Sequence, residues 1–83
     1  MAKLERVKEI VNGVLTGTDC VVFVSGNAED ENIVHVTVNK GDKELISATS
    51  DVKNHDTVGT TCDDTEEVFA LYCKIADAID NQY

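Results

Sequence analysis

The sequence predicts an α+β fold in which two helices cover one face of a three-stranded antiparallel meander, in the order α-β-β-β-α. Apolar residues recur every three or four positions near each end of the chain, whereas apolar and polar residues alternate in the middle. Turns that contain glycine or asparagine separate the alternating runs. With 83 residues the chain is long enough for one modest core. We therefore expect a single acidic domain over residues 1–83.

A first helix is predicted over residues 2–15. Its apolar side chains form one stripe that consists of Leu4, Val7, Ile10, Val11, Val14 and Leu15. Either Gly13 or Gly17 ends this helix. If Asn12 and Gly13 form the cap, the two apolar residues that follow lead into the sheet instead of closing the helix.

The middle of the chain predicts three strands. The first is a valine-rich run at residues 20–25, and the second, at 33–38, alternates between two faces as a half-buried strand does. Residues 39–42 form a predicted hairpin turn in which Gly41 supplies a positive φ. The return strand at 44–49 alternates less regularly.

The polar segment 50–62 leaves two alternatives open. It is either one long surface loop or a loop that contains a short fourth strand at about residues 57–61. A loop of this length is unusual in a compact domain.

A second helix is predicted to begin at Asp63 or Asp64. Glu66 or Glu67 then falls three residues later, as in a capping box, and all four carboxylates favour the positive end of the helix dipole. The apolar stripe of this helix consists of Val68, Leu71, Tyr72, Ile75 and Ile79.

Negative charge is concentrated after residue 16. Fourteen of the sixteen acidic side chains lie there against four basic ones, a net charge of −10, whereas residues 1–16 carry +1. A field of this sign repels phosphate backbones and anionic lipids, and it attracts basic protein surfaces. We therefore expect a basic protein as the partner, with no direct binding of nucleic acid or membrane.

Seven of the acidic residues form two groups, one between the first two strands and one at the start of the second helix, and Asp51 and Asp56 lie in the chain between these groups. The candidate partner-binding residues are Glu29, Asp30, Glu31, Asp51, Asp56, Asp63, Asp64, Glu66 and Glu67. One interpretation is that they provide solubility and helix capping. The other is that they imitate backbone phosphates and occupy the Lys- and Arg-lined groove of a nucleic-acid-binding protein.

No catalytic or cofactor-binding motif accompanies the charge. His35, His55 and the three cysteines lack the ligand spacing of zinc sites, and no glycine-rich phosphate loop or nucleophile–base motif is present. We expect a non-enzymatic protein with no metal and no cofactor. Cys20 and Cys73 are expected to pack against the core and Cys62 to be exposed. Three widely spaced cysteines favour a reducing compartment, so a cytoplasmic location is expected.

The order of helix, three strands and helix is similar to that of the double-stranded-RNA-binding domain. That family contacts RNA partly through a lysine-rich start of its last helix. Here the corresponding stretch is Asp63-Asp64-Thr65-Glu66-Glu67. Because the charge is inverted, RNA binding does not carry over from this resemblance.

About half of the chain resembles small acidic phage-encoded anti-CRISPR proteins, which imitate DNA to block the RNA-guided nuclease of type II systems. The similar residues run from Val7-Lys8-Glu9-Ile10 through Asp19, Val22 and Ser25-Gly26 to Val38-Asn39, Gly41-Asp42 and Leu45-Ile46-Ser47. The resemblance implies a DNA-mimic inhibitor of a CRISPR effector nuclease in the host cytoplasm. It nominates as contacts Glu29, Asp30, Glu31, Asp51 and Asp56. The segment before the last helix is longer here than in that family.

The leading hypothesis is therefore a protein that occludes the basic surface of a nucleic-acid-binding enzyme. The competing hypothesis is a homodimerisation or protein-interaction module, in which the uncovered sheet face or the apolar stripe of a helix pairs with a second copy and the acidic side chains maintain solubility.

Overall fold

The structure is a computed structural model that describes residues 2–62 and 65–83. Along this part of the chain the elements are α1 (Ala2–Leu15), β1 (Cys20–Gly26), β2 (Ile33–Lys40), β3 (Lys43–Asp51), β4 (Asp56–Thr61) and α2 (Glu66–Gln82). None of the helices in these ranges is long and apolar enough to cross a membrane.

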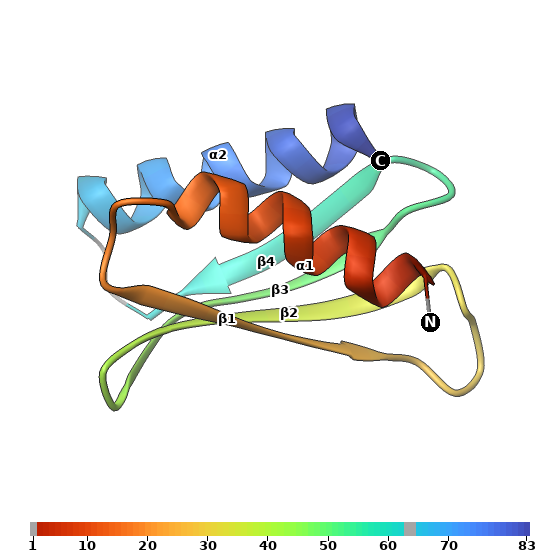
Figure 1. Ribbon diagram of the computed structural model, residues 1–83, viewed down its shortest axis with the longest axis horizontal. Coiled ribbons are helices and arrows are strands. Elements are labelled where there is room, and N and C mark those ends of the chain that lie inside the picture. The colour runs from red at the N-terminus through yellow and green to blue at the C-terminus, as the bar shows by residue number, and fades with distance from the viewer. Residues whose placement is uncertain (1, 63–64) are drawn as a thin grey trace.

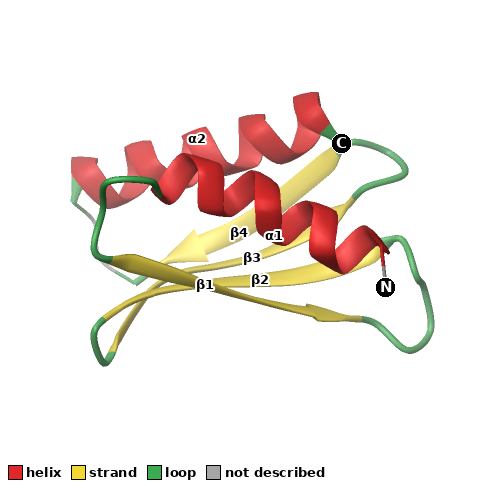
Figure 2. Cartoon of the chain, viewed as in Figure 1, coloured by secondary structure: helices red, strands yellow, loops and turns green. Residues whose placement is uncertain are grey.

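The four strands form one antiparallel sheet in chain order, and both helices lie on the same face of it (Figure 1). Helix α1 packs mainly on β1, and α2 packs on β4 and β3, with the two helices side by side. No helix of the described ranges lies on the opposite face of the sheet (Figure 2). The predicted α+β class is confirmed, with the short fourth strand present.

Helix α1 ends after Leu15, so the alternative that stopped it at Asn12 and Gly13 is wrong. The Leu15 side chain is buried, which keeps the last helical turn on the core. Gly17 then adopts a φ of +84°, and the backbone N–H and hydroxyl of Thr18 both donate to the Leu15 carbonyl, at 3.0 and 2.6 Å.

The β2–β3 hairpin has a two-residue loop, because Lys40 pairs with Lys43. Gly41 has a φ of +62° and Asp42 does not have a positive φ, an arrangement typical of a type II′ turn with glycine first. Shortly after the turn, the register shifts between Val38 and Asn39, so that Leu45 forms a bulge. Leu45 and the residue after it are consequently both buried, which explains the irregular alternation of this strand.

The segment 50–62 contains β4 rather than one long loop. Strand β3 extends to Asp51, β4 begins at Asp56, and these two residues pair. The connection is therefore only residues 52–55. It ends at His55, whose φ of 55° lies in the left-handed region.

Helix α2 begins at Glu66 with Thr65 as its N-cap. The Thr65 hydroxyl accepts a hydrogen bond from the Val68 backbone N–H at 3.3 Å. The prediction that Asp63 or Asp64 caps the helix is therefore wrong, and both residues lie outside the described part of the chain. The third helical position holds a valine, so the reciprocal glutamate of a capping box is missing.

The core lies between the sheet and the two helices. Its fully buried apolar side chains are Val7, Val11, Val34, Val36, Val38, Ile46, Ile75 and Ile79. Cys20 packs against this core as expected. Cys73 is exposed, which contradicts the prediction, because it lies two residues from both Leu71 and Ile75 and therefore on the opposite side of α2.

Candidate functional site

The sheet register brings five of the candidate carboxylates to one end of the molecule. The β1–β2 loop connects Gly26 to Ile33, Ile33 pairs with Asp51, and Asp51 pairs with Asp56. The loop acids therefore lie at the same end of the sheet as the β3–β4 turn. We call this surface the acidic end, and its members are Glu29, Asp30, Glu31, Asp51 and Asp56.

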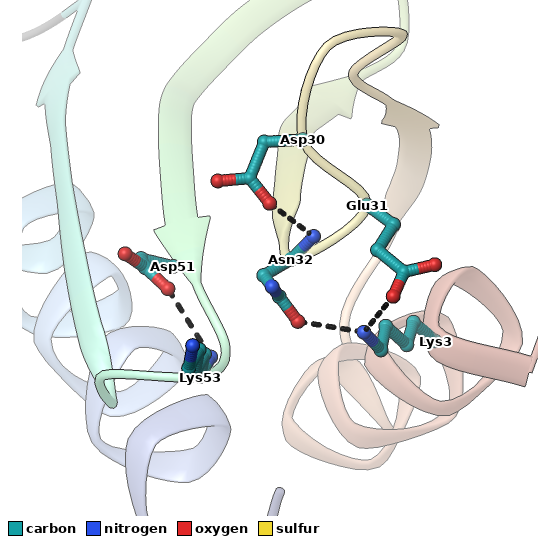
Figure 3. A network of polar contacts seen from close by, with 6 residues as sticks. All are labelled: Lys3, Asp30, Glu31, Asn32, Asp51 and Lys53. Carbon is teal, nitrogen blue, oxygen red and sulfur yellow. Dashed lines mark hydrogen bonds and ion pairs between the residues drawn. The ribbon is translucent and has the colours of Figure 1, made fainter.

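Hydrogen bonds hold the two loops of the acidic end together. The backbone N–H of Val52 donates to the carbonyl of Asn32 at 2.9 Å, which joins the β3–β4 turn to the β1–β2 loop. From α1, Lys3 Nζ donates to Asn32 Oδ1 at 2.6 Å and forms an ion pair with Glu31 at 3.5 Å (Figure 3). Two loops and one helix thus meet around Asn32.

The β1–β2 loop is ordered by its own short polar side chains. Asn27 Oδ1 accepts from the backbone N–H groups of Glu29 and Asp30, at 2.8 and 3.3 Å. Asp30 Oδ1 then accepts from the backbone N–H of Asn32 at 2.9 Å (Figure 3). These bonds are typical of Asx turns, in which the side chain replaces a backbone acceptor. One carboxylate oxygen of Asp30 is therefore already engaged in a hydrogen bond that stabilises the loop.

Asp51 has a similar structural role in the β3–β4 turn. Its Oδ1 accepts from the backbone N–H groups of Lys53 and Asn54, both at 3.2 Å, and its Oδ2 accepts from the Asn54 side-chain amide at 2.8 Å. The Asn54 side-chain bond is the main reason that the pKa of Asp51 is lowered, and it outweighs the opposing effect of desolvation. Asp51 is therefore a stable negative charge at neutral pH.

The remaining carboxylates of the acidic end face solvent. Within the described ranges, the side chains of Glu29 and Asp56 have no hydrogen-bond or ion-pair partner, and both residues are exposed. Glu31 stays 71% exposed despite its contact with Lys3. A cationic surface can therefore approach these three groups without first breaking a buried interaction.

The described members of the second predicted group lie at the other end of the sheet. Glu66 and Glu67 begin α2, which follows the end of β4 opposite to Asp56. The eight residues of β2 separate the two ends by about 24 Å, at about 3.4 Å per residue. Glu67 lines a hollow of about 580 Å³ that also contains Lys40 and Lys43. The structure thus splits the predicted acidic set in two, while Asp63 and Asp64 are outside the described residues.

Asp80 is a sixth carboxylate near the acidic end, and sequence reasoning missed it. It lies in the last turn of α2, where the helix dipole disfavours negative charge. Thr57 Oγ1 compensates by donating to Asp80 Oδ1 at 2.8 Å. Because the Thr57 hydroxyl has only one proton, the buried Ser50 hydroxyl must donate to Thr57, at 2.8 Å. A carboxylate in the last turn of a helix is electrostatically unfavourable, and this position could have predicted a compensating partner elsewhere in the chain.

The uncovered face of the sheet is mostly hydroxyl-bearing between the two charged ends. Strand pairing places Phe23, Thr37, Ser47 and Thr60 in one row across the sheet. In the next row, His35 Nδ1 lies 3.2 Å from Thr49 Oγ1. Three apolar side chains on this face are exposed, namely Val21 (50%), Phe23 (58%) and Val58 (59%).

The described residues do not form a cluster that is typical of a catalytic or metal-binding site. No group of three or more His, Cys, Asp or Glu side chains converges there as metal ligands would. Cys62 is exposed as expected, and its Sγ lies 3.9 Å from a Glu44 carboxylate oxygen. An open hollow of about 700 Å³ between α1 and the C-terminus is lined by Glu5, Arg6, Lys8, Glu9, Asn12 and Tyr83.

The chain matches no protein-family profile, no curated protein and no solved structure.

Proposed function

We propose that the acidic end is a docking surface with which this protein occupies a Lys- and Arg-lined surface of a nucleic-acid-binding protein and excludes phosphate from it. The observation that carries the proposal is the assembly of five carboxylates from two separate loops at one end of the sheet. The Val52–Asn32 hydrogen bond holds these loops in one arrangement. In this proposal the protein is an inhibitor by occupancy and performs no catalysis.

The physical basis is charge complementarity on a preorganised surface. Asx turns order both loops before binding, so little conformational entropy remains to be lost there. The net charge of −9 accelerates the encounter with a basic partner and makes that encounter sensitive to salt. Glu29, Glu31 and Asp56 supply the charges that are open to the partner.

The resemblance to phage-encoded anti-CRISPR proteins suggests the class of target. We infer an RNA-guided nuclease of a type II system, whose DNA-binding channel is positively charged. Such an inhibitor acts in the cytoplasm of the host cell. Charges at the acidic end then stand where phosphates of the target DNA would lie.

Competition with DNA tests this function. A guide-loaded type II nuclease is mixed with labelled target DNA, this protein is titrated in, and DNA release is followed by fluorescence anisotropy at several salt concentrations. We expect release of DNA, with an apparent affinity that falls as salt rises. Absence of release from every nuclease of a type II panel contradicts that target class. If this protein also fails to release nucleic acid from other basic nucleic-acid-binding proteins, the proposed function itself is contradicted.

A pair of variants tests which end makes the contact. Glu29→Gln with Glu31→Gln neutralises two charges at the acidic end, and Glu66→Gln with Glu67→Gln neutralises two at the other end. Because the net charge changes equally, any long-range effect is the same. We expect the first pair to weaken competition about tenfold more than the second, as for two lost charged contacts. Equal weakening would contradict the assignment to the acidic end.

A second candidate function is homodimerisation through the uncovered sheet face, which the exposed Val21, Phe23 and Val58 side chains favour. Analytical ultracentrifugation separates the two functions. A tight dimer that persists when Glu29 and Glu31 are neutralised would favour this alternative.

A further inference from the structure

Among the strands that the structure describes, β1 is an edge strand with a strand on one side only. The sheet order places β1 first, so it pairs only with β2. Along the described chain, no other backbone-to-backbone hydrogen bond reaches residues 20–26. About half of the N–H and C=O groups of such a strand point away from the sheet and can pair with another chain.

This edge lacks the features with which proteins usually block strand addition. Its sequence, CVVFVSG, contains no charge and no proline, and its register with β2 shows no bulge. The other edge strand, β4, is shorter, begins with the charged Asp56 and has Gly59 in its middle, which weakens a strand. Of the two edges, β1 is therefore the better template.

The side chains of β1 supply an apolar contact beside that template. Val22 is buried and Val24 is half-buried against the helices, whereas Val21 and Phe23 are 50% and 58% exposed on the uncovered face. An added strand with apolar residues at alternate positions would cover these two side chains while its backbone pairs with β1.

Charge at the two ends of β1 selects the occupant. Beyond Gly26 lies the acidic end with Glu29, Asp30 and Glu31, whereas the start of β1 pairs with Lys40 on β2 and has only Asp19 before it. A second copy of this chain also carries −9, so the two copies repel each other. A segment with basic residues at the end that lies beside Gly26 is attracted instead.

We propose that β1 accepts an extended segment of the basic partner protein as a fifth, antiparallel strand, with Lys or Arg residues preceding that strand and lying against the acidic end. This inference rests on the proposed function and adds the mode of docking. Antiparallel addition continues the pairing of the existing sheet. Because that strand then begins beside Gly26, its N-terminal flank is the one that meets the acidic side chains.

A synthetic peptide tests the docking mode without the nuclease. The probe has three arginines followed by alternating threonine and valine, and a control of identical composition has the arginines at its C-terminus. A third peptide carries N-methyl groups on alternate backbone amides, which removes strand hydrogen bonds while keeping the charge. We expect the probe to bind about tenfold more tightly than either control, since each control loses several charged or backbone hydrogen bonds. Amide hydrogen exchange should slow in residues 20–26.

Two substitutions with the same chemistry identify the edge. Val21→Lys and Val58→Lys each place a positive charge at an exposed position of the uncovered face, on β1 and on β4. Both change the net charge by one unit, and circular dichroism checks that both fold. We expect Val21→Lys to weaken probe binding about tenfold and Val58→Lys less than about twofold, because only the first places a charge on the edge strand where the apolar side chains of the added strand would pack.

Several outcomes would overturn the inference. They are equal binding of the probe and the N-methylated peptide, equal effects of the two lysine substitutions, protection of β4 instead of β1, and a β1-mediated homodimer in sedimentation. DNA competition that survives Val21→Lys unchanged would remove strand addition and leave the proposed function intact. Strand addition without any DNA competition would remove the proposed function instead.

Discussion

The two faces of the sheet are built from the same strands, yet they differ in what their side chains do. On the covered face of β2, Val34, Val36 and Val38 are completely buried beneath the helices. On the uncovered face of the same strand, His35 and Thr37 are half-buried and belong to rows rich in hydroxyl groups. Stability is therefore concentrated on one face. The other face, with the edge and the end beside it, is free to serve binding.

The largest expected effect follows from removing a side chain on the covered face. Ile46→Ala deletes a completely buried side chain between the sheet and the helices. We expect a loss of about 3–4 kcal/mol in the free energy of unfolding, measured by urea denaturation, because a cavity remains. The neighbouring substitution Ser47→Ala changes the uncovered face and should alter stability by less than about 0.5 kcal/mol. Similar losses of stability in the two variants would contradict the difference between the covered and uncovered faces.

The next effect concerns the close approach of β4 to β3 on the covered face. A Cβ at Gly59 would lie 2.6 Å from the Ala48 Cα and too close to the Ser47 carbonyl oxygen, and backbone atoms cannot move aside cheaply. We expect Gly59→Ala to cost about 2–3 kcal/mol in thermal or urea unfolding. As a control, Gly13→Ala in α1 meets no atom within 4 Å and should stabilise the protein by about 0.5–1 kcal/mol. A stable Gly59→Ala variant would show that β4 does not pack as described.

A substitution in the partly buried polar chain Ser50–Thr57–Asp80 should have a smaller effect. Thr57→Val leaves the Ser50 hydroxyl without its acceptor and Asp80 without its donor. We expect a loss of about 1–2 kcal/mol, and Thr57→Ser should restore most of it because the hydroxyl returns. On the uncovered face of the same strand, Thr60→Val should change stability by less than about 0.5 kcal/mol. Failure of serine to rescue would assign the loss to packing.

The smallest effect is a pH dependence at the boundary of the uncovered face and the acidic end. The pKa of Asp51 lies below its ordinary value of 3.8, so its stabilising contribution is fully present above that value. The contribution is lost as the pH falls through the lower pKa of the folded state. Asn54→Ala removes the main cause and should raise the pKa of Asp51 in an NMR titration, whereas Asn81→Ala should not. An unchanged titration in Asn54→Ala would show that the Asn54 side chain does not lower this pKa.

Much of the fold was predictable because periodicity reports burial directly. The stripe from Leu4 to Leu15 and the alternation around Val36 predict the first helix and the second strand without reference to any tertiary contact. The true end of α1 was not predictable in the same way. Asn12 and Gly13 form a good local cap, and only the burial of Leu15 against the sheet decides for the longer helix.

The sequence predicts which residues belong to the candidate site, but it does not predict how they are arranged in space. The sequence predicts every carboxylate of the acidic end as a candidate, but it does not separate them from Glu66 and Glu67, which lie at the opposite end of the sheet. Asp80 was missed because its partner Thr57 is 23 residues away in the chain. Distance across a sheet depends on register, which local sequence does not specify.

From the sequence alone came the sign and amount of charge, the two amphipathic helices and the alternating strands, because these depend on residue identity and short-range spacing. Tertiary structure alone decided which acidic residues share one surface, which face of the sheet stays uncovered and that β1 has a free edge. These properties arise from pairing between segments far apart in the chain, and each pairing is selected by the burial of the whole core.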